Sequence, residues 1–376
     1  MNEREVAELR RRLKPEKSAI THIHGCYVGE KKEVISTFTQ SVGLMPQPEA
    51  EKVMGLLKKT LSGTLGRNLL DVCFATMQVA DSEEHRRLMS LRNSRVSDEE
   101  ERNEFYQQVI QSLEMEGNYL ILLAHDSYDV PYRSKDDEEQ EDASTEVYSY
   151  ILCAVCPVKP TKPVLSYFVR ENEFHTLAPD WVVAQPEVGF LFPAFDDRSA
   201  NIYNALYYTR DIGEIHPELI EGLFRTQPIM PAAEQETTFR SVLGDTLEED
   251  CSLKVVQAVD DQLRELIETH KASKAPENLT LSKGAVKSLL RGCGVEQRRV
   301  ESFERKYDES FGADAALTPR NVVNTKQIEI VTPDVTIKVS ADRGDLVETR
   351  VIDGEKYILI RADDGAEVNG VAIKIK

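Results

Sequence analysis

Four short apolar segments in the middle of the chain constrain its fold more than any other feature. They are NYLILLAHD (118–126), VYSYILCAVCPV (147–158), VLSYFVREN (164–172) and VGFLFPAF (188–195). Each is short, with many β-branched or large apolar side chains, which is typical of strands. Strands bury their apolar side chains only within a sheet that another layer covers. Because helical patterns lie on both sides of this region, we predict an α+β fold with a strand-rich core and flanking helices.

The segments before this core predict two helices, a hairpin and a further strand. Apolar residues in the first thirteen positions have helical spacing, and Pro15 ends that helix. The sequences AITHIHGCYV and EVISTFTQ alternate around a polar turn at 29–32, as in a β-hairpin. A second helix is expected from Pro48, and NLLDVCFATM is expected to be a buried strand.

The C-terminal part predicts helices followed by a small β module. Residues 252–273 have a helical pattern, and KAPENLT (274–280) is predicted to be a linker. A pair of short helices, a helical hairpin, is predicted over 282–311, with Cys293-Gly294 at its turn. From about residue 326, apolar and polar residues alternate between the dipeptides Asp353-Gly354, Asp364-Gly365 and Asn369-Gly370. These dipeptides favour tight hairpin turns, so we predict an antiparallel β-meander.

These patterns divide the chain into three expected domains. The first is an α+β core domain over residues 1–250, the second a helical segment over 251–320, and the third a β-meander module over 321–376. Residues 134–146 include the run KDDEEQEDASTE, which has too few apolar side chains to pack. We therefore predict an exposed, mobile acidic loop within the first domain.

Charge and cysteine content limit the classes of function. The 376 residues include 46 Lys and Arg against 65 Asp and Glu, for a net charge of −19. A chain this acidic is poorly suited to binding nucleic acid over its whole surface. It has no apolar run of about 18 residues and a charged first turn, so neither a membrane span nor a secretory signal is expected. Six dispersed cysteines fit no disulfide framework, which indicates a cytoplasmic location.

Two polar segments at predicted strand ends form the candidate catalytic site. They are HDSYDVPYR (125–133) and FDDRSANIYN (195–204). The candidate side chains are His125, Asp126, Asp129, Arg133, Asp196, Asp197 and Arg198. If the segments meet, their four carboxylates would bind a divalent cation and His125 would act as a base, as in metal-assisted hydrolysis. The same residue types also form ordinary turns, and the sequence does not show that the segments meet.

The helix pair at 282–311 is the candidate nucleic-acid interface. Residues 282–306 hold seven Lys and Arg against three Glu, and Arg298, Arg299 and Arg305 would contact phosphates if they point outward. The alternative is a packing hairpin whose basic side chains are solvated or paired with acidic groups. We favour this alternative because helix pairs with short turns are common packing units.

Three further motifs are interpreted as structural. Cys153 and Cys156 lie in a predicted strand, where such positions face opposite sides, so they are expected to be buried residues rather than zinc ligands. His22 and His24 share a strand face without further ligands nearby and are expected to be exposed. The glycines of LKKTLSGTLGRN (57–68) follow a helix instead of preceding one, so a phosphate site is not expected.

Six longer segments carry a family resemblance. They are EVAELRRRLKPEKSAITHIHGCYV (5–28), LLKKTLSGTLGRNLLDV (56–72), EGNYLILLAHDSYDVPYR (116–133), YILCAVCPVKPTKPVLSYFVRENEFH (150–175), VGFLFPAFDDRSANIYNALYYTRD (188–211) and MPAAEQETTFRSVL (230–243). They resemble a bacterial family, found mainly in Firmicutes, called domain of unknown function 4317, and the tail VIDGEKYILIRADDGAEVNGV (351–371) is similar to it as well. The resemblance implies membership of the family, but no reaction and no catalytic residue.

The sequence as a whole favours a binding or interaction protein over an enzyme. No cofactor is expected, apart from the divalent cation that the hydrolase alternative requires. The expected partner is a protein, with nucleic acid as the alternative through 282–311, and no membrane partner is expected.

Overall fold

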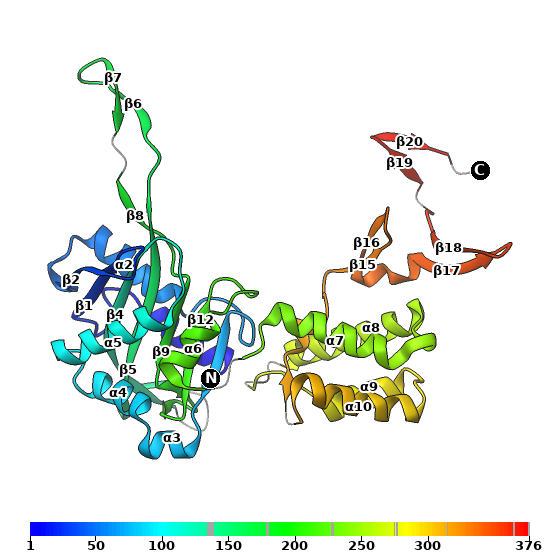
Figure 1. Cartoon of the computed structure of the whole chain (residues 1–376), viewed down its shortest axis with the longest axis horizontal. Helices are drawn as coiled ribbons and strands as arrows, with labels where there is room; N and C mark the ends of the chain where they lie inside the picture. Colours follow the sequence, from blue (N-terminus) through cyan, green and yellow to red (C-terminus); the bar gives the residue numbers. More distant parts are fainter. Residues whose placement is uncertain are drawn as a thin grey trace. The chain divides into compact units, whose positions relative to one another are not determined.

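The computed structural model of the chain describes residues 1–133, 139–177, 180–226, 229–273, 275, 277–313, 315–363 and 365–374. Of residues 132, 133, 139–146, 164 and 177 it describes the backbone alone. The chain divides into two units, residues 1–232 and 233–376, which Figure 1 colours along the sequence. The boundary that we expected at residue 250 differs from this division, because the helix over 232–247 packs into the core of the second unit.

An eight-stranded sheet forms the centre of the first unit. Its strands are β1 (His22–Val28), β2 (Val34–Ser41), β3 (Leu69–Cys73), β4 (Asn118–Arg133), β5 (Glu139–Pro160), β8 (Trp181–Val183), β9 (Val188–Phe192) and β12 (Asn204–Thr209). The strand order is β2-β1-β4-β5-β9-β12-β3, with β8 beside β5, and every pairing is antiparallel. The expected hairpin of β1 and β2 is confirmed, as are the predicted strands in β3, β4, β5 and β9.

Helices cover both faces of this sheet. They are α1 (Glu3–Arg12), α2 (Gln47–Lys59), α3 (Thr76–Asp81), α4 (Glu83–Asn93), α5 (Glu99–Ser112) and α6 (Pro217–Phe224). One core lies between the sheet and α4, α5 and α6, which lie in front of the sheet in Figure 1. A second core lies between the opposite face and α1 and α2. Because strand side chains alternate between faces, Ile151 and Cys153 enter the first core, and Leu152 and Ala154 enter the second.

β4 and β5 form a hairpin that extends beyond their neighbours. Residues 125–133, expected to be a loop, are the end of β4, and residues 139–146, expected to belong to the acidic loop, are the start of β5. Backbone pairing joins the two strands over this stretch, including Arg133 with Glu139. The backbone bonds of an antiparallel ladder do not depend on apolar side chains, which explains why the charged composition did not indicate a strand. The remaining residues of the expected loop, 134–138, lie outside the described residues.

The second unit contains a helical core. Its helices are α7 (Ala232–Leu247), α8 (Leu253–Ser273), α9 (Lys283–Gly292), α10 (Gln297–Phe311) and α11 (Pro319–Val322), with two short strands, β13 (Leu281–Ser282) and β14 (Ala316–Leu317). Phe239, Leu263, Val286, Leu290 and Phe303 are among the side chains buried in this core. The predicted helix pair over 282–311 is confirmed in α9 and α10.

The C-terminal strands form three separate hairpins rather than one meander. They are β15 (Gln327–Val331) with β16 (Thr336–Ser340), β17 (Val347–Ile352) with β18 (Glu355–Ile360), and β19 (Ala366–Val368) with β20 (Val371–Ile373). A 3-10 segment at Ala341–Leu346 separates the first two hairpins, and residues 361–365 separate the last two. Asp353-Gly354 and Asn369-Gly370 are the turns of the second and third hairpins, whereas Asp364-Gly365 lies between hairpins and the first hairpin turns at residues 332–335. The α+β class is confirmed.

Candidate functional site

The segment 125–133 presents its predicted catalytic side chains on two opposite faces of the sheet. Asp126 and Tyr128 are buried, and Tyr128 belongs to the core that α1 covers. His125 points to the other face, where its Nε2 lies 2.8 Å from the Ser149 hydroxyl. Burial, with Arg95 and Arg92 nearby, lowers the pKa of His125 to about 4. Asp129, which has the same strand parity as His125, is exposed. These side chains therefore do not converge on one site.

The Asp126 carboxylate is completely buried and accepts hydrogen bonds at both oxygens. Oδ1 accepts from the backbone N–H groups of Ala19 at 2.7 Å and Ser127 at 2.9 Å, and Oδ2 accepts from the Tyr150 hydroxyl at 2.6 Å. Burial raises the pKa of Asp126, while these donors act to lower it. The bonds attach the segment before β1 to β4, so Asp126 has a structural role.

The two predicted segments do meet, through an arginine instead of a carboxylate cluster. Arg198, in the turn between β10 (Ala194–Asp196) and β11 (Ser199–Asn201), donates to the Pro131 carbonyl at 3.0 Å and to Glu8 of α1 at 3.0 Å. Glu8 also accepts a 2.5 Å bond from the Tyr128 hydroxyl, and the Arg12 guanidinium lies 4.0 Å from the centre of the Tyr128 ring. This network joins α1, β4 and the β10–β11 turn.

The structure does not bring the four predicted carboxylates together as one group of metal ligands. Asp126 and Asp129 have opposite orientations, Asp196 accepts a 3.0 Å bond from Asn201, and Asp197 lies exposed in the turn. The side chain of Arg133 lies outside the described residues. Within the described part of the chain, one group of three potential metal ligands lies within 4.8 Å, and it contains none of these residues.

That group, Glu214, His216 and Glu218, has a structural explanation at the start of α6. The backbone N–H of His216 donates to Glu214 at 3.2 Å, and His216 Nδ1 lies 3.1 Å from Glu218. Glu218 also accepts a bond from the backbone N–H of Glu114 at 3.3 Å. These contacts hold the first turn of α6 against the segment after α5, so the group by itself does not indicate a cation.

The histidine and cysteine motifs are structural. Burial and the nearby Arg102 lower the pKa of His24 to about 4, and its Nδ1 lies 2.9 Å from the Thr39 hydroxyl. His22 is exposed as expected, but His24 is buried, which corrects the expectation for that residue. Cys153 and Cys156 are buried in the cores on opposite faces of the sheet, as predicted, and burial raises the pKa of both thiols.

The basic side chains of the helix pair are largely committed to acidic groups of the same unit. Arg299 contacts Glu248 at 3.1 Å and Asp250 at 2.7 Å, and Arg298 contacts Glu296 at 2.8 Å. Lys283 and Lys287 belong to α9. Lys283 contacts Asp308 of α10, and Lys287 contacts Glu304 of the same helix. Arg305 is exposed. The structure therefore gives the predicted phosphate-binding residues other roles, with Arg305 as the exception.

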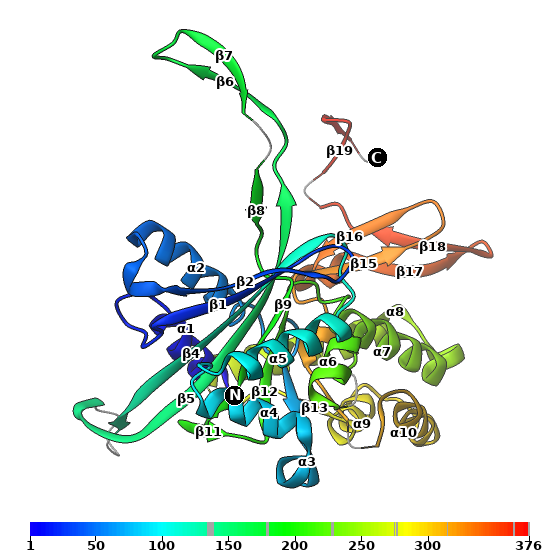
Figure 2. The same cartoon turned by 60° about the vertical axis from the view of Figure 1, so that its left-hand side comes forward.

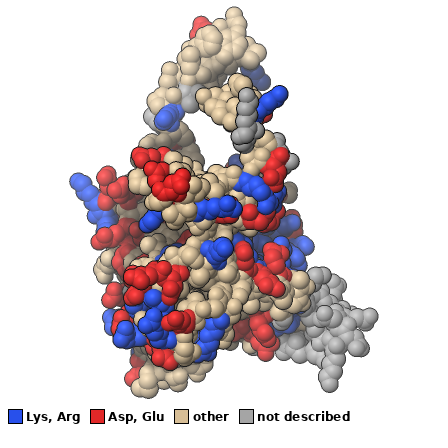
Figure 3. All heavy atoms as spheres, turned by 90° about the vertical axis from the view of Figure 1, so that its right-hand side faces the viewer, with Lys and Arg blue, Asp and Glu red and all other residues tan. Residues whose placement is uncertain are grey.

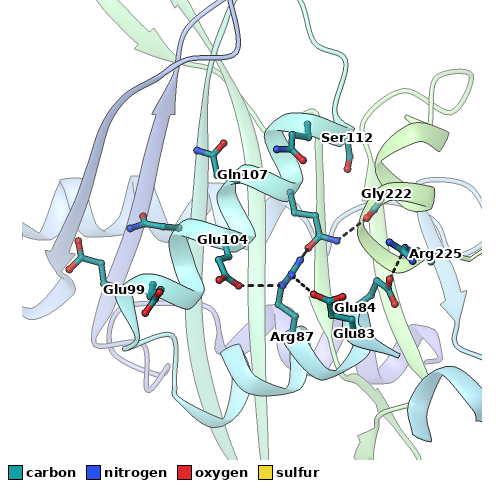
Figure 4. Close-up of a pocket in the computed structure, with 13 residues that line it drawn as sticks. Glu83, Glu84, Arg87, Glu99, Glu104, Gln107, Ser112, Gly222 and Arg225 are labelled. Carbon is teal, nitrogen blue, oxygen red and sulfur yellow. Dashed lines mark hydrogen bonds and ion pairs between the residues drawn. The ribbon is translucent and has the colours of Figure 1, made fainter. Parts of the chain in front are cut away.

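An open groove of about 870 Å³ lies over α4, α5 and α6 (Figure 4). Arg87 contacts Glu83 at 3.1 Å and Glu104 at 3.9 Å, and Arg225 contacts Glu84 at 2.6 Å. Figure 4 shows that the Arg87–Glu83 contact lies within α4, whereas Arg87–Glu104 joins α4 to α5 and Arg225–Glu84 joins the end of α6 to α4. The groove is acidic, but its two arginines are ion-paired to its own glutamates, within α4 and between helices, and these pairs give the charged groups a structural role.

An apolar surface that neither core of the first unit explains is an arm that we define as residues 161–183. It contains β6 (Val164–Phe168) and β7 (Glu173–Leu177), which pair only with each other among the described strands, and ends in β8. Figures 1 and 2 both show β6 and β7 standing clear of the main sheet. The exposed large apolar side chains of the arm are Leu165, Tyr167, Phe168, Val169, Phe174, Trp181, Val182 and Val183. No described residue of the arm belongs to either core of its unit.

The arm has one uncharged face and one charged face. Leu165 pairs with Thr176, and Tyr167 pairs with Phe174, so these four side chains share a face that we call the uncharged face. Its two rings lie 5.1 Å apart. The opposite face includes Glu173 and His175, which lie 3.5 Å apart. In Figure 3 the arm, at the top, shows few charged side chains.

Sequence reasoning identified the apolar segment 164–172 but placed it in the central sheet. The same β-branched and aromatic composition suits a strand in the core and a strand in a projecting hairpin. Pro160 and Pro163 were the available signal, because proline interrupts a ladder and is found at strand edges and ends. They mark the end of β5, after which the chain leaves the main sheet.

A comparison with protein families gives a match over almost the whole chain. The family model described as "Domain of unknown function (DUF4317)" matches residues 1–371. No curated protein matches the chain. Across the described residues, no helix combines the length and apolarity that crossing a membrane requires.

Proposed function

We propose that this chain, which belongs to the DUF4317 family of unknown function, is an interaction protein that binds another protein surface through the apolar arm. The observation that carries the proposal is the exposure of large apolar side chains on a two-stranded extension. Leu165 is 65% exposed, Phe174 is 67% exposed and Trp181 is 56% exposed. Contiguous exposed apolar surface of this kind marks interaction sites in soluble proteins.

The hairpin geometry supports the same conclusion. An isolated two-stranded hairpin is marginally stable in water, because it has too few neighbours to bury its side chains. Both outer edges of the β6–β7 ribbon have no strand neighbour among the described residues. A partner surface would provide the missing layer and would bury the aromatic side chains. Aromatic residues are enriched at the energetically dominant positions of protein interfaces.

The remaining surfaces give weaker support for other functions. The carboxylates of the hydrolase alternative are separated, and the basic residues of the nucleic-acid alternative are mostly paired. We place the binding event in the cytoplasm, because all six cysteines are free, as expected in a reducing compartment.

Site-specific photo-crosslinking tests the proposed function. A photoreactive phenylalanine analogue at position 174 is expected to form covalent products with a protein partner in cells that make this chain naturally. The same analogue at Lys52, an exposed position on α2, is the matched control. Products that form at position 52 as readily as at position 174, or at neither, would overturn the proposal.

A further inference from the structure

The arm has the properties of a symmetric self-association surface. We propose that its partner is a second copy of this chain, and that the two uncharged faces pack against each other about a two-fold axis. This inference rests on the proposed function, because it names the partner of the same arm.

The first argument is symmetry. A two-fold axis places the same patch of each copy against itself, so the patch must be complementary to itself. The uncharged face meets this condition, because Leu165, Tyr167 and Phe174 would contact the same apolar side chains of the second copy. The opposite face is less suited, because it would take the Glu173 carboxylates of both copies out of water. Burying a charge without full compensation opposes association.

The second argument is the available area. A large side chain that is about half exposed presents on the order of 100 Å² to solvent. Phe168 lies on the opposite face, so the other seven exposed apolar side chains of the arm offer roughly 700 Å², close to what one partner contributes to a standard interface. The side chains of the uncharged face alone do not provide the area of a standard interface. We therefore expect Val169 at the turn and Trp181 at the base of the arm to become buried as well.

The third argument is charge. The chain has a net charge of −19, so two copies repel each other over most of their surfaces. Residues 161–183 hold Lys162 and Arg170 against Glu171, Glu173 and Asp180, and are therefore almost neutral. A projecting, nearly neutral arm is the part that two such acidic chains can bring together at lowest electrostatic cost. An anionic membrane would be repelled by the same net charge, with only two basic side chains on the arm to attract it.

The sole tryptophan of the chain gives a direct readout of this contact. Trp181 lies in β8 beside Pro160 and is largely exposed. Its emission in dilute solution is expected to be that of a solvated indole and to shift to shorter wavelength as association removes water from the ring. Because no second tryptophan contributes, this shift reports on the base of the arm.

The decisive experiment measures the mass of the full chain by sedimentation at concentrations from about 1 to 100 µM, which brackets the affinity of a modest interface. We expect a dimer at the upper concentrations and a parallel shift of the Trp181 emission. Added salt should strengthen association, because it screens the repulsion between the acidic chains. The variant Leu165→Ser/Phe174→Ser should raise the dissociation constant at least tenfold with little change in Tm, since neither side chain packs in a core. Leu44→Ser/Met77→Ser removes two apolar side chains elsewhere in the unit that are even more exposed, and it should leave the dimer unchanged.

Each unfavourable result has a distinct meaning. A monomer throughout this range would overturn the second copy as partner, and crosslinking from position 174 to a different protein would then leave the proposed function standing. A monomer with no crosslinked partner would overturn both. A dimer that survives Leu165→Ser/Phe174→Ser would show association through another surface and would overturn the inference. Sedimentation of the chain with vesicles of mixed anionic and neutral phospholipid would also contradict it.

Discussion

The Tyr150 hydroxyl donates a 2.6 Å hydrogen bond to Asp126, and both side chains are completely inaccessible to solvent. Asp126 looked like a metal ligand because it follows an apolar strand. Its buried partners show instead that it joins β4, β5 and the segment before β1. Burial raises the pKa of the carboxyl, and burial and the neighbouring carboxylate raise the pKa of Tyr150. Removal of the carboxylate would leave these buried donors without an acceptor, so substitution of Asp126 measures what the hydrogen bonds contribute to stability.

Asp126→Ala should destabilise the first unit by about 2 to 4 kcal/mol. The substitution leaves the Tyr150 hydroxyl and the Ala19 N–H buried without their acceptor. Chemical denaturation measures the loss. Asp129→Ala, at an exposed position three residues along the same strand, is the control and should change the free energy of unfolding by less than about 0.5 kcal/mol. A loss below about 1 kcal/mol for Asp126→Ala would contradict the structural role.

His125 should make the stability of the first unit depend on pH. Burial, with Arg95 and Arg92 nearby, lowers the pKa of His125 to about 4, whereas an unfolded histidine has a pKa near 6.5. The unfolded chain therefore binds a proton first as the pH falls. The contribution of His125 is complete above about pH 6.5 and is lost progressively toward pH 4.

His125→Gln should remove about 1 to 2 kcal/mol of this pH dependence, a figure reduced for the partial exposure of the ring. The free energy of unfolding, measured at intervals between pH 7.5 and 4, gives the slope for each protein. His24 has a similarly low pKa, so His24→Gln/His125→Gln should flatten the profile further. If His125→Gln kept the wild-type slope, protonation of the half-buried His125 would not be the cause of the pH dependence.

Gly222 should be intolerant of any side chain. A Cβ at this position would lie 2.0 Å from the Ser112 Oγ and 2.5 Å from its Cβ, because α6 approaches the end of α5 closely. We expect Gly222→Ala to cost about 1 to 3 kcal/mol through this overlap. Gly55→Ala, in a helix position with open space around it, should instead stabilise by about 0.5 to 1 kcal/mol. Thermal unfolding compares the two, and Ser112→Gly should partly restore Gly222→Ala. Equal effects of the two alanines would show that the helix approach is looser than described.

Substitutions of Arg298, Arg299 and Arg305 should change the stability of the second unit according to the contacts that each arginine makes. None of them should reveal an affinity for nucleic acid. Arg299 donates to the Thr246 carbonyl and lies beside Glu248 and Asp250, and its side chain is only 12% exposed. Arg299→Ala should therefore destabilise the second unit by about 1 to 3 kcal/mol. Arg298→Ala and Arg305→Ala, at exposed positions, should have effects below about 0.5 kcal/mol. Denaturation followed by circular dichroism measures all three variants. A mobility shift with duplex DNA at low salt that disappears in Arg298→Ala/Arg305→Ala would reinstate the nucleic-acid interface.

The sequence by itself determined which segments are strands and helices across most of the chain. Alternating apolar residues identified β1 and β2, and 3.6-residue spacing identified α9 and α10, because these local periods follow from the backbone geometry alone. The opposite orientations of Cys153 and Cys156 followed from the same strand period. Family membership also followed from the sequence, because long segments carry it.

Only the tertiary structure decided which surfaces each segment contacts. From the sequence, we placed Asp126 and Asp129 in one site because both are carboxylates. In β4 they point to opposite faces of the sheet, and α1 covers only the face with Asp126. Arg198 was a candidate catalytic residue, and in the fold it links the β10–β11 turn to Glu8 and Pro131. Segment 164–172 had a core-like composition, yet it left the sheet after Pro160 and kept its aromatic side chains exposed. Composition records how apolar a segment is, whereas burial depends on long-range contacts that no local pattern encodes.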